Sequence, residues 1–209
     1  MRKSVLLMGS IFAWLAVSCG SDSSTIHLQG ENNATTLQTA VETAFPSDKV
    51  VSELSLYTPA LDTRLQFIAV DYWEGEEEYH QVYDLKEGLQ EKTETLASQN
   101  IKRLPQITHK SKDWVFTLKD VDYTKMNENF LKGVTLVMEE YPEDTDETYN
   151  NFILHRYTFK ADKENKIRES LTLHAKKVGE SVRQHKRSTT TNYYEFTFVV
   201  LENGELEWR

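Results

Sequence analysis

The alternation of apolar and polar residues constrains the fold of this chain more than any other feature. In YYEFTFVVLENGELEW, residues 193–208, three aromatic side chains fall on every second position. This spacing is typical of a strand that buries one face. The Asn203-Gly204 pair that follows offers the two positive-φ positions of a type I′ turn. We therefore predict a closing hairpin whose aromatic face lies in the core.

Similar runs recur along the chain and are broken by few helical patterns. Residues 36–45 and 122–133 carry apolar side chains at helical spacing, and Pro46 and Gly133 are expected to end these two helices. The rest predicts an antiparallel, β-rich meander, so the fold class is α+β with one or two short helices. The expected strands or hairpins are 50–57, 64–73, 79–85 with 89–96, 113–121, 133–141, and 152–160 with 166–176.

Two stretches of the chain look alike. Residues 67–96 and 135–173 each read as an apolar strand, an acidic loop, an aromatic strand, a charged turn and a further strand, with a short helix upstream. This pattern suggests two helix-plus-meander units. A chance likeness between antiparallel meanders explains it equally well, because short strand patterns carry little information on register.

The N-terminus carries the most specific motif. Arg2 and Lys3 precede a mostly apolar, uncharged run over 4–17, and the sole cysteine, Cys19, follows small residues. This stretch resembles the signal peptide and lipobox of bacterial lipoproteins, in which the cysteine is acylated. The resemblance implies a signal peptide over 1–18, lipidated Cys19 with a flexible tether over 19–34, and a β-rich globular domain over 35–209. An ordinary signal peptide with an incidental cysteine is the alternative.

Charge and motifs narrow the function classes. The formal net charge is −9, which argues against nucleic acid as a partner. No catalytic motif is present, the six histidines lack metal-ligand spacing, and the acidic loops read as solvated. We therefore expect no catalytic residues, metal or cofactor.

One basic patch is a candidate binding site for an acidic partner, a lipid headgroup or an anionic glycan. The alternative is that it is only a charged strand edge. The patch comprises Lys176, Lys177, Arg183, Lys186 and Arg187.

These features favour a non-enzymatic binding or scaffolding lipoprotein of the bacterial cell envelope. Its expected partners are the membrane, through the N-terminal lipid, and an envelope protein or glycan. Gly20 stands where the resemblance would place an inner-membrane retention aspartate, which implies the outer membrane. One alternative is a carbohydrate-binding or carbohydrate-processing lipoprotein, and another is a small-ligand pocket protein. The carbohydrate alternative depends on a platform of Trp73, Trp114, Trp208, Tyr72, Tyr193 and Tyr194.

Overall fold

The computed structural model describes residues 25–103, 112–142, 148–180, 183–185, 188–190 and 192–209. Its α-helices are α1 (Ala34–Ala44), α2 (Leu96–Arg103) and α3 (Met126–Glu140), with a 3₁₀ turn at Leu118–Asp120. The strands are β1 (Val50–Val51), β2 (Glu53–Tyr57), β3 (Phe67–Glu74), β4 (Glu77–Asp84), β5 (Gly88–Leu89), β6 (Thr93–Glu94), β7 (Phe116–Thr117), β8 (Tyr149–Ala161), β9 (Ile167–Lys177), β10 (Arg183–His185), β11 (Ser188–Thr190), β12 (Tyr194–Val200) and β13 (Leu206–Trp208).

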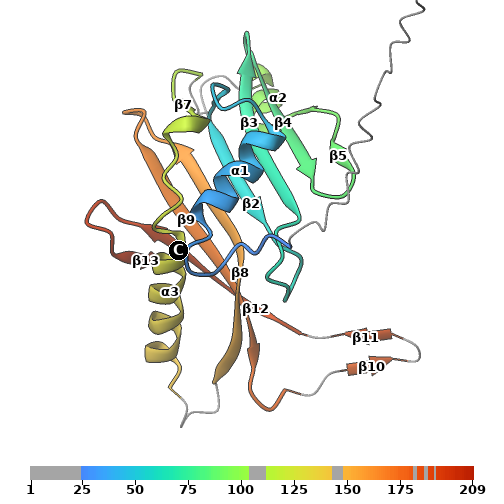
Figure 1. Cartoon of the computed structure of the whole chain (residues 1–209), viewed down its shortest axis with the longest axis vertical. Coiled ribbons are helices and arrows are strands. Elements are labelled where there is room, and N and C mark those ends of the chain that lie inside the picture. The colour runs from blue at the N-terminus through green and yellow to red at the C-terminus, as the bar shows by residue number, and fades with distance from the viewer. Residues whose placement is uncertain (1–24, 104–111, 143–147, 181–182, 186–187, 191) are drawn as a thin grey trace, which may run out of the picture.

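One large antiparallel sheet dominates the fold (Figure 1). Its nine strands run in the order β13-β12-β9-β8-β2-β3-β4-β5, and β6 also pairs with β4. Two meanders therefore meet where β2 pairs with β8, with Leu54 opposite Phe159 and Leu56 opposite Tyr157. The predicted α+β fold with an antiparallel meander is confirmed.

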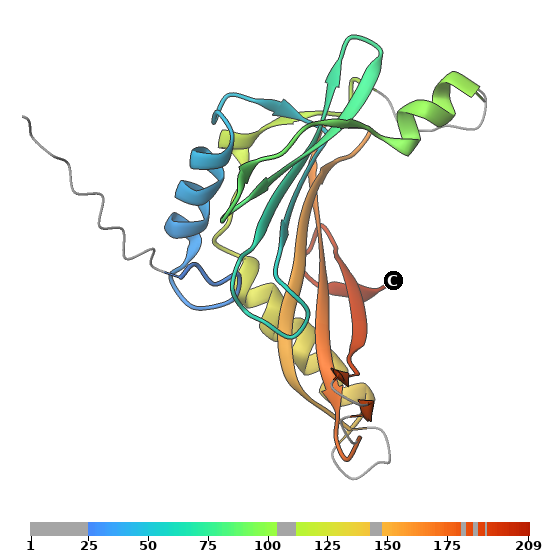
Figure 2. The same cartoon turned by 90° about the vertical axis from the view of Figure 1, so that its right-hand side faces the viewer.

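The two faces of this sheet differ in kind. Helices α1 and α3 lie on one side, which we call the helix face, and α2 lies on the other side near the end of the β3–β4 hairpin (Figure 2). The helix face holds the core, including the fully buried Tyr157, Phe159 and Phe198. The opposite face, called here the open face, is polar and pairs its own hydroxyl groups, for example Ser55 with Thr158 at 2.8 Å. An antiparallel sheet tolerates such an uncovered polar face.

The N-terminal segment corrects the predicted tether. Residues 25–33 were expected to be flexible, but Leu28 is fully buried and its N–H donates to the Thr63 carbonyl. The Gln29 side chain also accepts a hydrogen bond from the N–H of Leu154 at 2.7 Å. A single buried leucine and a few backbone bonds anchor this otherwise polar segment, so its composition misled the prediction. From Ile26 on, the chain is therefore held against the domain, and residues 19–24 lie outside the described residues.

Helix α1 matches the predicted helix at 36–45, whereas α3 differs from its prediction. The sequence predicts that Gly133 ends the second helix and that a strand follows over 133–141. Instead α3 continues through Gly133 to Glu140. A Cβ at Gly133 would lie 3.1 Å from Cδ1 of Leu173 and 3.4 Å from a ring carbon of Phe198. The glycine therefore permits close packing of the helix on the sheet, and it does not act as a helix cap.

The closing hairpin forms as predicted, but its turn is of another type. Phe198 pairs with Trp208 and Val200 with Leu206. Only Gly204 has a positive φ in this turn, 78°, and its N–H donates to the Leu201 carbonyl at 2.9 Å. A type I′ turn needs positive φ at both central residues, so Asn203 does not take the predicted role. Its side-chain oxygen accepts from the N–H of Glu205 instead.

Two helix-plus-meander halves are visible, with element correspondences that differ from the predicted ones. Helix α1 precedes β2, β3, β4 and β5, and α3 precedes β8, β9, β12 and β13. The predicted repeat matched β3 to residues 135–141, of which 135–140 belong to α3, so its alignment of the two halves was wrong.

The predicted strand over 113–121 is also shorter than expected: only β7 forms, and the 3₁₀ turn follows it. No helix among the described residues is long and apolar enough to cross a membrane.

Candidate functional site

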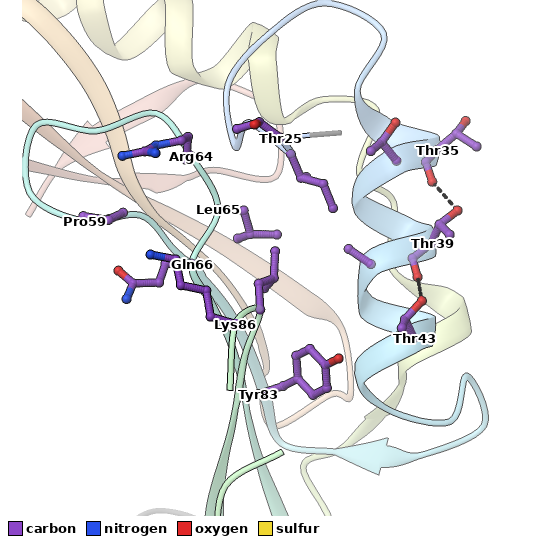
Figure 3. A pocket seen from close by; sticks show the side chains of 14 residues that line it. Thr25, Thr35, Thr39, Thr43, Pro59, Arg64, Leu65, Gln66, Tyr83 and Lys86 are labelled. Carbon is purple, nitrogen blue, oxygen red and sulfur yellow. Dashed lines mark hydrogen bonds between the residues drawn. The ribbon is translucent and has the colours of Figure 1, made fainter. Parts of the chain in front are cut away.

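A groove of about 690 Å³ opens between α1 and the strands beside it (Figure 3). One wall is α1, and the other includes Leu65, Tyr83 and Leu85. Figure 3 shows Leu65 and Tyr83 extending from the sheet side toward the helix. Thr25 and Ile26, at the start of the described chain, line the groove as well. The groove therefore has the size of a small-ligand site and an apolar floor.

The helix wall of this groove is built from threonines. The Thr39 hydroxyl donates to the Thr35 carbonyl at 2.8 Å, and the Thr43 hydroxyl donates to the Thr39 carbonyl at 2.7 Å. Each hydroxyl proton is thus engaged within the helix. The methyl groups of Thr39 and Thr43 remain for contact, so this wall is less polar than its composition suggests.

Two cations stand at the rim of the groove. Arg64 forms an ion pair with Asp62 and also donates through Nε at 2.9 Å. This pairing lowers the pKa of Asp62 to about 2, with the Arg64 side-chain hydrogen bond as the main cause. Lys86 is exposed and lines the same groove. Because Asp62 already neutralises Arg64, Lys86 is the rim cation that can meet an anionic group while the floor contacts an apolar chain.

A second cluster lies on the open face, across β8, β9 and β12. It consists of His155, His174 and Glu195, and their ligand-type atoms all lie within 4.8 Å of one another. Pairing of β9 with β12 sets His174 opposite Glu195. His155 lies in a bulge of β8 between Leu154 and Arg156. Alternation from the buried Leu154 places His155 on the open face.

The rings of this cluster are stacked. The His155 and His174 ring centroids are 3.8 Å apart, and Tyr193 stacks on the other side of His174 at 4.2 Å. His174 is only 1% exposed, and its Nε2 lies 3.1 Å from Oε1 of Glu195. Burial lowers the pKa of both histidines, that of His155 to about 4. Both imidazoles are therefore neutral at pH 7.

A third polar cluster fastens α3 to the sheet. Asn129 donates to the Tyr157 hydroxyl at 2.8 Å, and Tyr157 donates to the Glu169 carboxylate. Burial raises the pKa of Glu169. The cluster borders a pocket of about 350 Å³ next to the closing turn. Because its polar groups satisfy one another, we assign it to the joining of helix and strands.

The predicted basic patch is only partly within the described residues. Lys176 and Lys177 end β9, where both are partly buried. Arg183 begins β10. Lys186 and Arg187, like Cys19, lie outside the described residues. The patch therefore stays a prediction.

The six aromatic residues proposed as a sugar platform do not form a row. Tyr72 is buried and Trp73 and Trp114 are partly buried. Trp208 packs against Phe198 on the helix face, whereas Tyr193 stacks on His174 on the open face. Tyr194 packs against Tyr149, so these six side chains do not make one stacking platform.

Sequence reasoning missed the histidine cluster. The positions of its members in the chain, 155, 174 and 195, show no ligand spacing. Pairing of the predicted strands would have matched His174 to Glu195 only with the register known. The bulge that brings His155 beside them has no sequence signature that we can identify.

Comparisons with models of protein families, with curated proteins and with solved structures find no match for this chain.

Two histidines of the open face, His80 and His155, should have pKa values shifted in opposite directions from that of a free imidazole. His80 Nδ1 lies 2.7 Å from Asp71, and this hydrogen bond raises its pKa above 6.5. In protein from which metal ions have been removed with EDTA, NMR titration should give a His80 pKa above 6.5 and a His155 pKa of about 4. Asp71→Asn should lower the His80 pKa and leave that of His155 unchanged.

The lowered pKa of His155 also determines how the free energy of unfolding changes with pH. The unfolded chain protonates His155 near pH 6.5, whereas the folded chain does so at about 4. The unfolded state therefore binds more protons in this window, and His155 lowers the free energy of unfolding as the pH falls through it. A His155 pKa near 6.5 would contradict the burial described here.

Proposed function

We propose that this chain is a lipid-anchored binding protein of the bacterial cell envelope, held at the outer membrane through Cys19. The proposed ligand is an elongated amphipathic molecule with an acyl chain and an anionic group. The observation that carries this proposal is the groove along α1, with its apolar floor and cationic rim. A non-enzymatic role agrees with this groove, whose lining supplies contact surfaces and no paired acid and base.

The composition of α1 supports a binding role for its groove wall. Thr35, Thr36, Thr39 and Thr43 are all exposed and all line the groove. Threonine is a weak helix former, costing roughly 0.5 kcal/mol or more relative to alanine at each exposed position. Stability alone would favour alanine, glutamate or lysine at these sites. Branched methyl-bearing side chains are useful there if the wall contacts an apolar ligand.

The position of the groove also agrees with membrane anchoring. Thr25 lines the groove and follows Cys19 by six positions. Six extended residues span at most about 20 Å. An acylated Cys19 would therefore keep the groove close to the bilayer surface, where amphipathic molecules are concentrated. Two or more acyl chains are sufficient for stable anchoring.

Anchoring is tested by Cys19→Ala. The variant should lose incorporation of a fatty-acid analogue and should accumulate as a precursor or leave the membrane fraction, because no thiol remains for acylation. Metabolic labelling followed by fractionation measures both effects. Equal labelling of variant and wild type would show that Cys19 is not the anchor.

Ligand binding is tested with a soluble form that begins at Thr25 and a visible-fluorescent fatty acid. Thr39→Trp places an indole in the groove and should weaken binding at least about tenfold, or about 1.4 kcal/mol. Gln38→Trp is the matched control, because Gln38 is exposed on the same helix but does not line the groove.

The rim is tested with the same probe. Lys86→Glu should weaken binding of the fatty acid but not of its uncharged methyl ester, because only the acid needs a cation. No measurable binding by the wild-type protein, or equal losses in Thr39→Trp and Gln38→Trp, would reject the groove as the ligand site.

A further inference from the structure

We propose that His155, His174 and Glu195 bind one divalent transition-metal ion, of which Zn²⁺ is the best match. The three side chains come from adjacent strands, and their ligand-type atoms lie within 4.8 Å of one another. This site is on the open face, whereas the groove along α1 lies on the helix side of the sheet. The two proposals therefore depend on different residues.

The chemistry of the donors selects the class of metal. Two imidazole nitrogens and one carboxylate are typical ligands of zinc, and imidazole also suits copper, nickel and iron. Calcium and magnesium prefer sets made wholly of oxygen. Three protein ligands leave a fourth tetrahedral position for water or another small ligand.

Unpaired nitrogen atoms are the second observation that points to a ligand. The Nδ1 atoms of His155 and His174 are buried, and neither has a hydrogen-bond partner in the structure. Buried polar groups nearly always have a partner, and leaving one without costs roughly 1–3 kcal/mol. His174 in particular is 1% exposed, so water cannot readily satisfy it. A metal ion bound at Nδ1 of either ring would supply the partner that this nitrogen lacks, and at His174 the Glu195 carboxylate would have to leave Nε2 to reach the same ion.

The bulge in β8 indicates that this arrangement is built into the fold. His155 is the residue left unpaired in this bulge, and the bulge lets both His155 and Arg156 lie on the open face after the buried Leu154. The His155 carbonyl, released from the regular ladder, accepts from the N–H of Thr58 at 2.9 Å. Arg156 follows His155 in the chain, donates to Thr172 at 3.3 Å and lies over the Tyr57 ring at 5.9 Å.

Binding requires a small rearrangement of two ligands. Tetrahedral zinc with bonds of about 2.0–2.1 Å holds its ligand atoms about 3.4 Å apart, which is closer than the 4.8 Å span here. Stacked rings also cannot both direct a lone pair at one ion, so His155 must turn out of the stack. Glu195 can swing inward because 57% of its side-chain surface is exposed. His174, held against Tyr193, stays as the fixed ligand.

The test uses Co²⁺ as a spectroscopic probe for the zinc site. The full chain, purified in detergent without a polyhistidine tag and stripped with EDTA, should develop visible d–d absorption on addition of one equivalent of Co²⁺. One equivalent of Zn²⁺ should abolish this absorption. Glu195→Gln is the principal variant, since an exposed side chain can be changed without unfolding the protein, and it should weaken Co²⁺ binding at least tenfold.

Further variants separate this site from other histidines. His155→Gln and His174→Gln should lose the absorption, with circular dichroism melts to confirm that each variant is folded. His80→Gln is the control, because His80 also lies on the open face but pairs with Asp71, and it should bind Co²⁺ like the wild type. No d–d absorption in the wild type, or unchanged affinity in Glu195→Gln, would overturn the proposed site.

Discussion

The pairing of β2 with β8 is the contact on which the rest of the structure depends, because within the described residues no other ladder joins the two meanders. On the helix face it sets Leu54 beside Phe159 and Leu56 beside Tyr157, and all four side chains are fully buried. Burial of each such side chain contributes about 1.5–3 kcal/mol. The hydrogen bond between Ser55 and Thr158 on the open face adds about 0.5–1.5 kcal/mol. The apolar side of this pairing therefore decides its register, since a slip by one residue would move the core side chains to the polar face.

This two-faced sheet explains where the two proposed sites lie. The groove forms on the helix side, between α1, whose threonines line it, and a wall that includes Leu65 and Tyr83. The histidine cluster forms on the open face, where no helix of the described residues covers β8, β9 and β12. Each site belongs to a different half of the sheet. The groove and the histidine cluster therefore keep a fixed position relative to each other only if the β2–β8 pairing holds both halves in one folded unit.

The sequence predicted those parts of the fold that follow from periodicity. The closing hairpin, α1 and the β8–β9 hairpin were recognisable because each buries one face and leaves the other exposed. Prediction failed where one residue type serves several purposes. Gly133 was interpreted as a helix cap, but it permits the close approach of α3 to Leu173, and the apolar residues after it fit a strand as well as a helix. The sites were harder still. The α1 threonines recur at helical spacing, but the bulge at His155 depends on tertiary packing that no local pattern encodes.

Native-state hydrogen exchange tests most directly whether the two meanders form one cooperative unit. Under conditions in which exchange reports the opening free energy, the slowest amides of β3 and of β9 should share one value, equal to the global free energy of unfolding. The amides of β2 and β8 that bond to each other should show this same value, because neither half can open without breaking that pairing. A plateau for β9 and β12 clearly lower than that for β2 and β3 would contradict the account, since it would show that one half unfolds while the other remains intact.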